Sequence, residues 1–246
     1  MRDLKLQSVN NIRLNKFISE TGFASRRKAD DLIKSGKVLI NGQIAKVGET
    51  INPTQDKVTI DSQELVIKSS VYYAVYKPKG IISSAKDESD RKTVTDLVDT
   101  TVRIYPIGRL DKDSEGLMIL TNDGELTQEL THPKHEHKKE YEVIVKAQKK
   151  KDQIDEKVIV NSFLSGLHIE EKIMKADHVS IKALGQKSWK ITAILHTGYN
   201  RQIRKMCDKI GLEVIKLVRI RIAKLSLKDL QLLPGQYKQI SKIDII

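Results

Sequence analysis

Residues 106–124 read PIGRLDKDSEGLMILTNDG, a polar, glycine-bounded segment that runs directly into an apolar strand. The segment holds an arginine, Arg109, then Leu110, and two aspartates, Asp111 and Asp113. Two interpretations are open at this point: a solvated turn between two strands, and a catalytic loop at a strand junction. The rest of the chain has to decide between them.

The sequence around this segment alternates strand-like and helix-like stretches. Apolar and β-branched runs predict strands at residues 72–78, 103–108, 117–122, 141–146, 189–195, 213–220 and 223–227. Helical patterns fall at residues 93–98, 125–130, 151–166 and 200–211, the last of which ends at Gly211. These patterns predict an α+β domain with an extended, mostly antiparallel sheet flanked by helices, over residues 72–246.

The N-terminal part predicts a small separate domain of two helices and a hairpin. Apolar residues at helical spacing mark the two helices: Leu14, Phe17 and Ile18, then Ala29, Leu32 and Ile33. Ser25 is the expected N-cap of the second helix, and Gly22 and Gly36 end the two helices. The Asn41-Gly42 pair predicts a tight turn between two strands, with a third strand at 58–60. We expect this domain over residues 11–60, followed by a polar linker at 61–71.

The charge of the chain indicates a polyanionic partner. Its 246 residues include 44 Lys+Arg against 32 Asp+Glu, which gives a formal net charge of +12. The alternative is that this charge only prevents self-association. Aromatic residues make up 4% of the chain, which argues against extensive stacking of bases on aromatic side chains. Contacts to phosphates and to RNA shape would carry the affinity.

Several site types are excluded by the residues that the chain contains. A single cysteine, Cys207, excludes an intramolecular disulfide and fits a reducing, cytoplasmic location. No apolar run approaches the length of a membrane span, so we expect a soluble protein. Glycine-rich nucleotide-binding motifs are absent. The histidine cluster THPKHEH at 131–137 has no cysteine partner and lies in a lysine-flanked loop, so we expect no metal there.

Four motifs together resemble a known enzyme family. GRLDKD (108–113), KKEYEVIV (138–145), GYNRQIRKM (198–206) and the upstream KPKG (77–80) resemble, in the same order, the motifs of ribosomal-RNA pseudouridine synthases of the RsuA/RluB/RluF type. The N-terminal unit is similar to the αL RNA-binding motif of a small-subunit ribosomal protein, which is attached to these synthases. The resemblance runs from about Ile12 to the last strands. PIGRLDKDS and NRQIRKMC are most similar to the RluF type, which acts on large-subunit rRNA.

The resemblance implies an isomerase that converts a uridine of 23S ribosomal RNA to pseudouridine by base flipping. The glycosidic bond is broken and re-formed through carbon five, so neither a metal nor another cofactor is expected. Two alternatives stay open: the same chemistry on tRNA or small-subunit rRNA, and a non-catalytic RNA-binding or ribosome-assembly factor. We expect ribosomal RNA as the partner, no membrane, no obligate protein partner, and a monomer.

The resemblance also implies roles for individual residues. Asp111 is the essential carboxylate, acting either as a nucleophile or as a base, and Arg204 is its expected buried partner. Tyr141 packs on the target uracil, although a strand tyrosine in the core is the alternative. Arg109 is expected to help flip the base, while Asp113 shapes the loop and its glycines let the RNA backbone approach.

Further residues are expected to contact the substrate or the rest of the RNA. The substrate-binding residues are Arg109, Leu110, Lys77, Arg201 and Ile203. Lys77 is expected to support the site or a phosphate, and Arg201 to face RNA more than the acid. The RNA-binding residues of the N-terminal domain are Arg13, Lys16, Ser25, Arg26, Arg27 and Lys28. Most of the latter gather at the start of the second helix, where the helix dipole favours an anion. A solvated helix end is the alternative.

Overall fold

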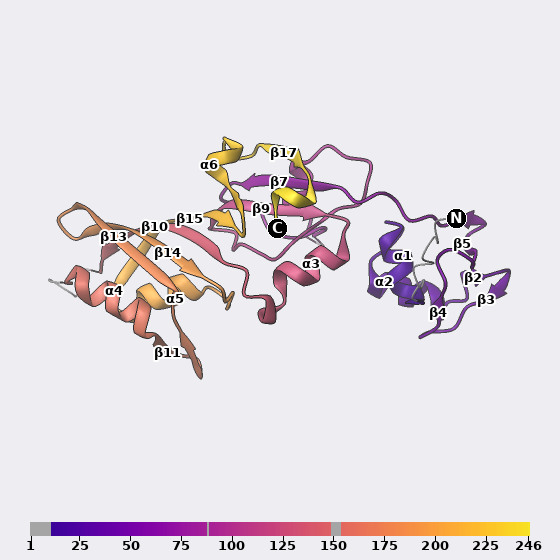
Figure 1. Ribbon diagram of the computed structural model, residues 1–246, viewed down its shortest axis with the longest axis horizontal. Helices are drawn as coiled ribbons and strands as arrows, with labels where there is room; N and C mark the ends of the chain where they lie inside the picture. Colours follow the sequence, from indigo (N-terminus) through magenta and orange to yellow (C-terminus); the bar gives the residue numbers. More distant parts are fainter. Residues whose placement is uncertain (1–10, 88, 149–153) are drawn as a thin grey trace, which may run out of the picture. The chain divides into compact units, whose positions relative to one another are not determined.

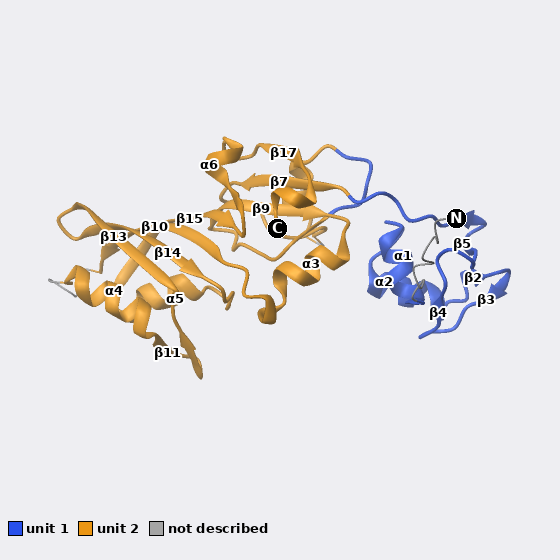
Figure 2. Ribbon diagram, viewed as in Figure 1, with its two compact units in different colours: residues 1–70, 100–104 blue, residues 71–99, 105–246 orange. Residues whose placement is uncertain are grey.

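The computed structural model describes residues 11–87, 89–148 and 154–246, and the chain divides into two compact units (Figure 2). The first unit comprises residues up to 70 together with 100–104, and the second comprises 71–99 and 105–246. Strand β6 (Gln63–Glu64) pairs with β5 (Val58–Ile60), and Leu65 is buried. The ordered part of the first unit therefore extends beyond residue 60, into the expected linker.

The first unit has the two helices and the hairpin that its sequence predicts. Helices α1 (Leu14–Glu20) and α2 (Arg26–Lys34) bury the apolar residues expected from their spacing, among them Phe17 and Ile33. The strands β2 (Val38–Ile40), β3 (Gln43–Ile44), β5 and β6 form a sheet in the order β3-β2-β5-β6, and β1 (Ile12–Arg13) pairs with β4 (Thr50–Ile51). Asn41 and Gly42 both have positive φ, as a two-residue hairpin turn requires.

The second unit is built on one large sheet, drawn in Figure 1. Its main path runs β13-β14-β10-β15-β9-β7-β17, while β8 pairs with β9 and β16 with β15. The strands are β7 (Tyr72–Lys77), β8 (Tyr105–Pro106), β9 (Glu115–Thr121), β10 (Lys139–Ala147), β13 (His178–Gly185), β14 (Ser188–Leu195), β15 (Leu212–Ile222), β16 (Leu225–Ser226) and β17 (Tyr237–Ile240). Only the β15–β9 pair is parallel among the described strands, so the expected mostly antiparallel sheet is confirmed.

Helices cover the sheet and complete two apolar cores. Helices α4 (Glu156–Ser165) and α5 (Gln202–Lys209) pack with β10, β14 and β15, where Phe163 and Met206 are fully buried. Helix α3 (Gly124–Thr131) packs with β7 and β9 in a second core that includes Leu126. The α+β class is therefore confirmed. Within the part of the chain that the structure describes, no helix combines the length and apolar character needed to cross a membrane.

Some elements differ from those that the sequence patterns predict. The edge strands β13 and β17 and the short hairpin of β11 (Leu167–Ile169) and β12 (Lys172–Met174) were not expected. Residues 227–230 form a short helix, α6 (Leu227–Leu230), in place of the end of a strand, and residues 94–97 form the 3-10 helix η1. The start of the helix expected over 151–166 lies outside the described residues. Strand β13 has Val179, Ile181 and Ala183 at alternate positions, a strand signal that was open to sequence reasoning.

Candidate active site

The loop between β8 and β9 holds Asp111 in a defined position. Strand β8 pairs with the far end of β9, and the chain then returns through residues 107–114 to the first residue of β9. Ser83 fixes the middle of this loop, because its hydroxyl donates to the carbonyl oxygen of Leu110 (2.7 Å) and accepts from the Leu110 N–H (3.0 Å). A turn closes the loop, with the Ser114 N–H donating to the Asp111 carbonyl oxygen (3.1 Å).

Lys77 secures the other side of the loop. Its side chain is fully buried at the end of β7, and its ammonium group donates to the carbonyl oxygens of Ser114 (2.7 Å) and Pro78 (3.1 Å). Burial lowers the pKa of Lys77 to about 8, although the nearby carboxylates of Asp111 and Asp113 act in the opposite direction. Because its ammonium group donates to carbonyl oxygens inside the protein, Lys77 supports the loop, which is one of its two expected roles, and its contact with substrate stays a prediction.

A row of residues crosses the sheet next to the loop. The strand register aligns Tyr141 of β10 with Arg219 of β15, Arg219 with Gly116 of β9, and Gly116 with Lys77 of β7. Gly116 has φ of +119°, and a Cβ atom there would overlap the backbone of Arg219. The glycine is thus required by the approach of β15, which corrects the expectation that it makes room for RNA.

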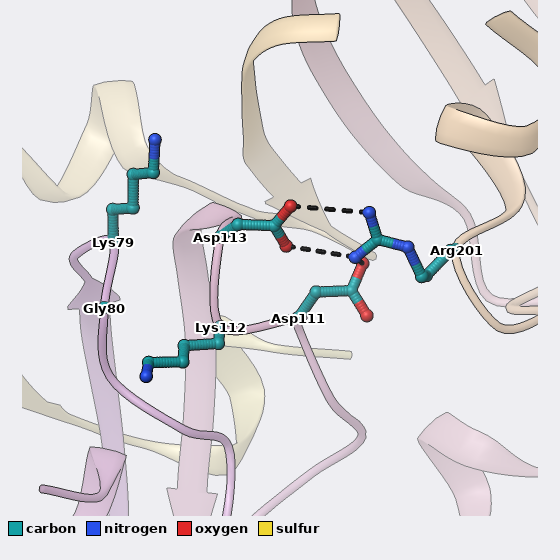
Figure 3. A pocket seen from close by; sticks show the side chains of 6 residues that line it. All are labelled: Lys79, Gly80, Asp111, Lys112, Asp113 and Arg201. Atoms are coloured by element: carbon teal, nitrogen blue, oxygen red, sulfur yellow. Dashed lines mark hydrogen bonds and ion pairs between the residues drawn. The ribbon is translucent and has the colours of Figure 1, made fainter. Parts of the chain in front are cut away.

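A pocket of about 500 Å³ opens over this loop and contains both of its aspartates. Figure 3 shows its lining residues: Lys79, Gly80, Asp111, Lys112, Asp113 and Arg201. The two terminal nitrogens of Arg201 lie 3.2 and 3.4 Å from the two carboxylate oxygens of Asp113. One of these nitrogens, Nη1, also lies 3.8 Å from Oδ2 of Asp111. Arg201 therefore faces both acids, whereas it was expected to face RNA more than the acid.

Arg204 occupies a different position from the one expected. Its Nη2 atom donates to the carbonyl oxygen of Asp113 (3.0 Å) and to the hydroxyl of Ser114 (3.2 Å), and lies 3.4 Å from Oδ2 of Asp113. The expected buried pair of Asp111 with Arg204 is not formed, because the Arg204 guanidinium contacts Asp113 and Ser114 instead. Among the described residues, the cation paired with Asp111 is Arg201.

The charge of Asp113 is maintained by these two arginines. Partial burial acts to raise the pKa of Asp113, but the hydrogen bond from Arg201 and the charges of Arg204 and Arg201 outweigh it, so the pKa lies below its ordinary value. Asp113 is therefore ionised near neutral pH, and it holds two cations close to Asp111. The sequence assigned to it only the shape of the loop.

The start of α5 places Arg201 at the pocket. Arg201 precedes the first residue of the helix and has a left-handed backbone conformation, with φ of +52°. The next residue, Gln202, is buried, and its side-chain oxygen accepts from the Thr197 hydroxyl (3.0 Å) and the Tyr199 N–H (3.2 Å). Its amide group donates to the carbonyl oxygen of Lys175 (3.3 Å). The side chain of Gln202 thus connects the loop before α5 with the backbone at Lys175.

The remaining predicted site residues have different surroundings. Tyr141 is half-buried and packs against the core beneath α4 and α5, while Arg109 is exposed. Leu110 is buried in the loop, and its contact with substrate stays a prediction. Ile203 is also buried, on the apolar side of α5 with Met206, and its contact with substrate likewise stays a prediction.

The cations predicted to bind RNA in the first unit gather at the start of α2. Ser25 is the N-cap, and its hydroxyl accepts from the Lys28 N–H (3.3 Å). The side chains of Arg26, Arg27 and Lys28 are exposed. Arg13 is exposed as well, whereas Lys16 is half-buried and pairs with Glu20 of its own helix.

Sequence reasoning missed three residues that organise the site: Ser83, Gln202 and Arg219. Arg219 is buried, and its Nε donates to the Leu117 carbonyl oxygen (2.8 Å), while its Nη2 has no hydrogen-bond partner in the described structure. An arginine within an apolar strand is a signal that was open to sequence reasoning, because a buried arginine is rare without a specific contact. Ser83 and Gln202 carry no such signal. No group of three or more metal-binding side chains gathers among the described residues.

Comparison with known proteins gives consistent relatives for both units. A family profile described as RNA pseudouridylate synthase matches residues 71–209, and one described as S4 domain matches residues 12–57. Ribosomal large subunit pseudouridine synthase B of Bacillus subtilis (strain 168) is 42% identical over 224 residues, which are 89% of this chain and 88% of that protein. The dual-specificity RNA pseudouridine synthase RluF of Escherichia coli (strain K12) is 36% identical over 240 residues, covering 96% and 78% of the two chains.

A solved structure agrees with these relatives. A crystal structure of a pseudouridylate synthase is 27% identical, has a TM-score of 0.63, and covers 95% of this chain and 98% of its own. A chain of an H/ACA ribonucleoprotein bound to a substrate RNA containing 2'-deoxyuridine has a TM-score of 0.50 at 14% identity, over 67% of this chain and 50% of its own, and shares the fold alone.

Proposed function

Because this chain belongs to the RNA pseudouridylate synthase family and is an RNA pseudouridine synthase, we propose that it isomerises a specific uridine of large-subunit ribosomal RNA to pseudouridine, with Asp111 as the reacting carboxylate. The single observation that carries the residue assignment is the pocket in which the loop after β8 presents Asp111 next to Arg201. The large-subunit substrate is supported by the relative from Bacillus subtilis, whose name specifies that subunit.

The reaction breaks the bond between N1 of uracil and C1' of ribose, and forms a bond between C5 and C1'. The hydrogen on C5 leaves and N1 gains one, so the composition of the nucleotide does not change. Asp111 acts on the ribose as a nucleophile or as a base, and both roles need an ionised carboxylate with an open oxygen. The guanidinium of Arg201 places a positive charge 3.8 Å from Oδ2 of Asp111.

The other residues of the site act on the base and on its neighbours. The target uridine must leave its stack to reach Asp111, at a cost of roughly a few kcal/mol. Arg109 is exposed on the same loop, and its planar guanidinium suits it to fill the space that the flipped base leaves. Tyr141 packs on the flipped uracil in this proposal. Its half-buried position gives the ring both a core contact and an accessible part.

The test compares the wild-type protein with the Asp111→Asn variant on unmodified large-subunit ribosomal RNA. Pseudouridine is mapped by carbodiimide labelling and primer extension. We expect a modified position with the wild type and a loss of at least about 1,000-fold in rate with the variant, since the nucleophile or base is removed while the side-chain shape is kept. RNA binding should change little. Equal modification by both proteins would reject the role of Asp111.

A second substrate class is supported by one comparison. The Escherichia coli relative is named a dual-specificity RNA pseudouridine synthase, so activity on more than one RNA is a reasonable extension to this chain. Small-subunit rRNA and tRNA transcripts belong in the same assay. Modification of one of these in place of large-subunit rRNA would redirect the substrate proposal and leave the chemistry in place. An Asp111→Asn variant that kept the biological role of the protein would favour an assembly factor.

A further inference from the structure

Asp111 and Asp113 lie on the same loop, but among the described residues only the carboxylate of Asp113 accepts hydrogen bonds from an arginine. Asp113 takes both terminal nitrogens of Arg201 and also lies 3.4 Å from Nη2 of Arg204. The carboxylate of Asp111 receives no hydrogen bond within the described part of the chain, and its separation from Arg201, 3.8 Å, is beyond hydrogen-bond range. Figure 3 shows the guanidinium of Arg201 facing Asp113, with Asp111 beside it.

This difference matters because of what an arginine does to a reacting carboxylate. A nearby cation favours ionisation, which the reaction requires. A bidentate arginine pair, however, occupies both carboxylate oxygens with strong, charge-assisted hydrogen bonds. Such a pair would have to break before the carboxylate attacked carbon or removed a proton. The site thus needs Arg201 close to Asp111 but not bound to it.

We propose that Asp113 is a positioning residue: by engaging both terminal nitrogens of Arg201, it holds this cation beside Asp111 and leaves the oxygens of Asp111 open to the substrate. The inference rests on the proposed role of Asp111. Arg204 assists, since its bonds to the Asp113 carbonyl oxygen and to Ser114 keep the turn in place. The left-handed backbone of Arg201, together with the Gln202 bonds behind it, restricts where the guanidinium reaches.

The proposal predicts a specific defect when the charge of Asp113 is removed. In Asp113→Asn the side-chain shape is kept, but the amide no longer retains Arg201, which then moves onto Asp111. We expect kcat to fall about tenfold, while KM stays within about twofold, because Asp111 must first be released from its new partner.

Removing Arg201 from this variant should partly restore the rate. In Asp113→Asn/Arg201→Gln no arginine is left at this position to capture Asp111, so we expect at least about threefold faster turnover than in Asp113→Asn alone. A purely structural role of Asp113 predicts the opposite order, since a second substitution would add damage. A double variant that is no faster than Asp113→Asn, or an Asp113→Asn variant as fast as wild type, would overturn the proposal.

The assay measures tritium released from RNA labelled at C5 of uridine, since that hydrogen leaves in the reaction. Asp99→Asn is the matched control, because Asp99 is exposed in the same unit and outside the pocket. Thermal unfolding and circular dichroism monitor folding of every variant. If Asp113→Asn does not fold, Asp113→Ser replaces it in both the single and the double variant, because it also removes the carboxylate that engages Arg201 and should show the same restored rate.

In this design the identity of the substrate RNA and the role of Asp113 are tested independently. Ribosomal and transfer RNA are labelled and assayed in parallel, and the variant rates are compared on whichever RNA reacts with the wild type. Release from transfer RNA alone would reject the ribosomal substrate, while the ratio of the double to the single variant would still decide the role of Asp113. Release from neither RNA by the wild type would reject the proposed function and the inference with it.

Discussion

Two aspartates separated by a single residue, Asp111 and Asp113, have different surroundings. Asp113 is held by two arginines, whereas Asp111 faces the pocket with one cation nearby. Lys77 of the KPKG motif, which was expected at the site, is buried and supports the loop. At the scale of single residues, the chemistry of the site depends on which charges are satisfied inside the protein.

Lys77 should make stability depend on pH in the alkaline range. Its pKa falls from 10.5 to about 8 on folding because of burial, so between these values the unfolded state binds more protons. The free energy of unfolding therefore rises with pH across this window, and the penalty is fully present below pH 8. We expect the rise in wild type to exceed that in Lys77→Met by up to about 3 kcal/mol.

Urea unfolding at several pH values between 8 and 10.5 measures this difference. The control is Lys79→Met, which changes an exposed lysine two residues along the chain and should keep the wild-type slope. Parallel curves for wild type and Lys77→Met would contradict the assignment of this pH dependence to Lys77.

Strand β15 pairs in parallel with the start of β9, directly after the loop that holds Asp111. There β15, a strand from the C-terminal part of the chain, lies beside the strand that follows the loop of Asp111. Gly116 makes this possible, since any side chain there would meet the backbone of Arg219. The pairing of β9 with β15 beside the loop therefore depends on Gly116 having no side chain.

Replacing Gly116 should cost far more than replacing the other glycine of the loop. In Gly116→Ala the strands must separate and the residue must keep a positive φ, so we expect a loss of more than about 3 kcal/mol in the free energy of unfolding. Gly108→Ala is the control: its φ is +72° but nothing lies within 4 Å, so the cost should be about 1 kcal/mol. Urea unfolding checks both, and equal losses would show that conformational strain alone matters.

The candidate site and the cations expected to bind RNA belong to different units of the chain. The first unit presents cations at the start of α2, and the second holds the pocket. Since the chain carries a net charge of +12, phosphate contacts are expected to supply most of the affinity. A basic, S4-like unit and a catalytic unit in one chain fit a protein that must select one uridine within a large, structured RNA.

Neutralising the start of α2 should weaken RNA binding without changing the chemistry. For Arg26→Gln/Arg27→Gln/Lys28→Gln we expect the slope of log Kd against log salt to fall by about two to three, with kcat at saturating RNA within about twofold of wild type. Filter binding at several salt concentrations measures the slope. Lys34→Gln/Lys37→Gln/Lys46→Gln removes the same charge from exposed positions elsewhere in the unit and should keep it. Equal effects of the two triple variants would indicate that only the net charge matters.

The sequence by itself determined the class of fold, the family and the order of the motifs. Helical spacing located α1 and α2, and the Asn41-Gly42 pair located a hairpin, because these signals are local. The long strands of the second unit were found because their apolar residues are continuous, as in β9, or alternate, as in β14. Strand β13 was missed although its apolar residues also alternate.

Only the tertiary structure decided how the charged residues of the site are paired. Arg201 and Arg204 are separated from Asp111 by about 90 positions in the chain, and the reach of two flexible side chains cannot be deduced from their order. The strand register then decided that Gly116 serves β15 and that Lys77 lies inside the protein. Local patterns specify elements because their forces act over a few residues, whereas ion pairs and close backbone contacts depend on how distant segments meet.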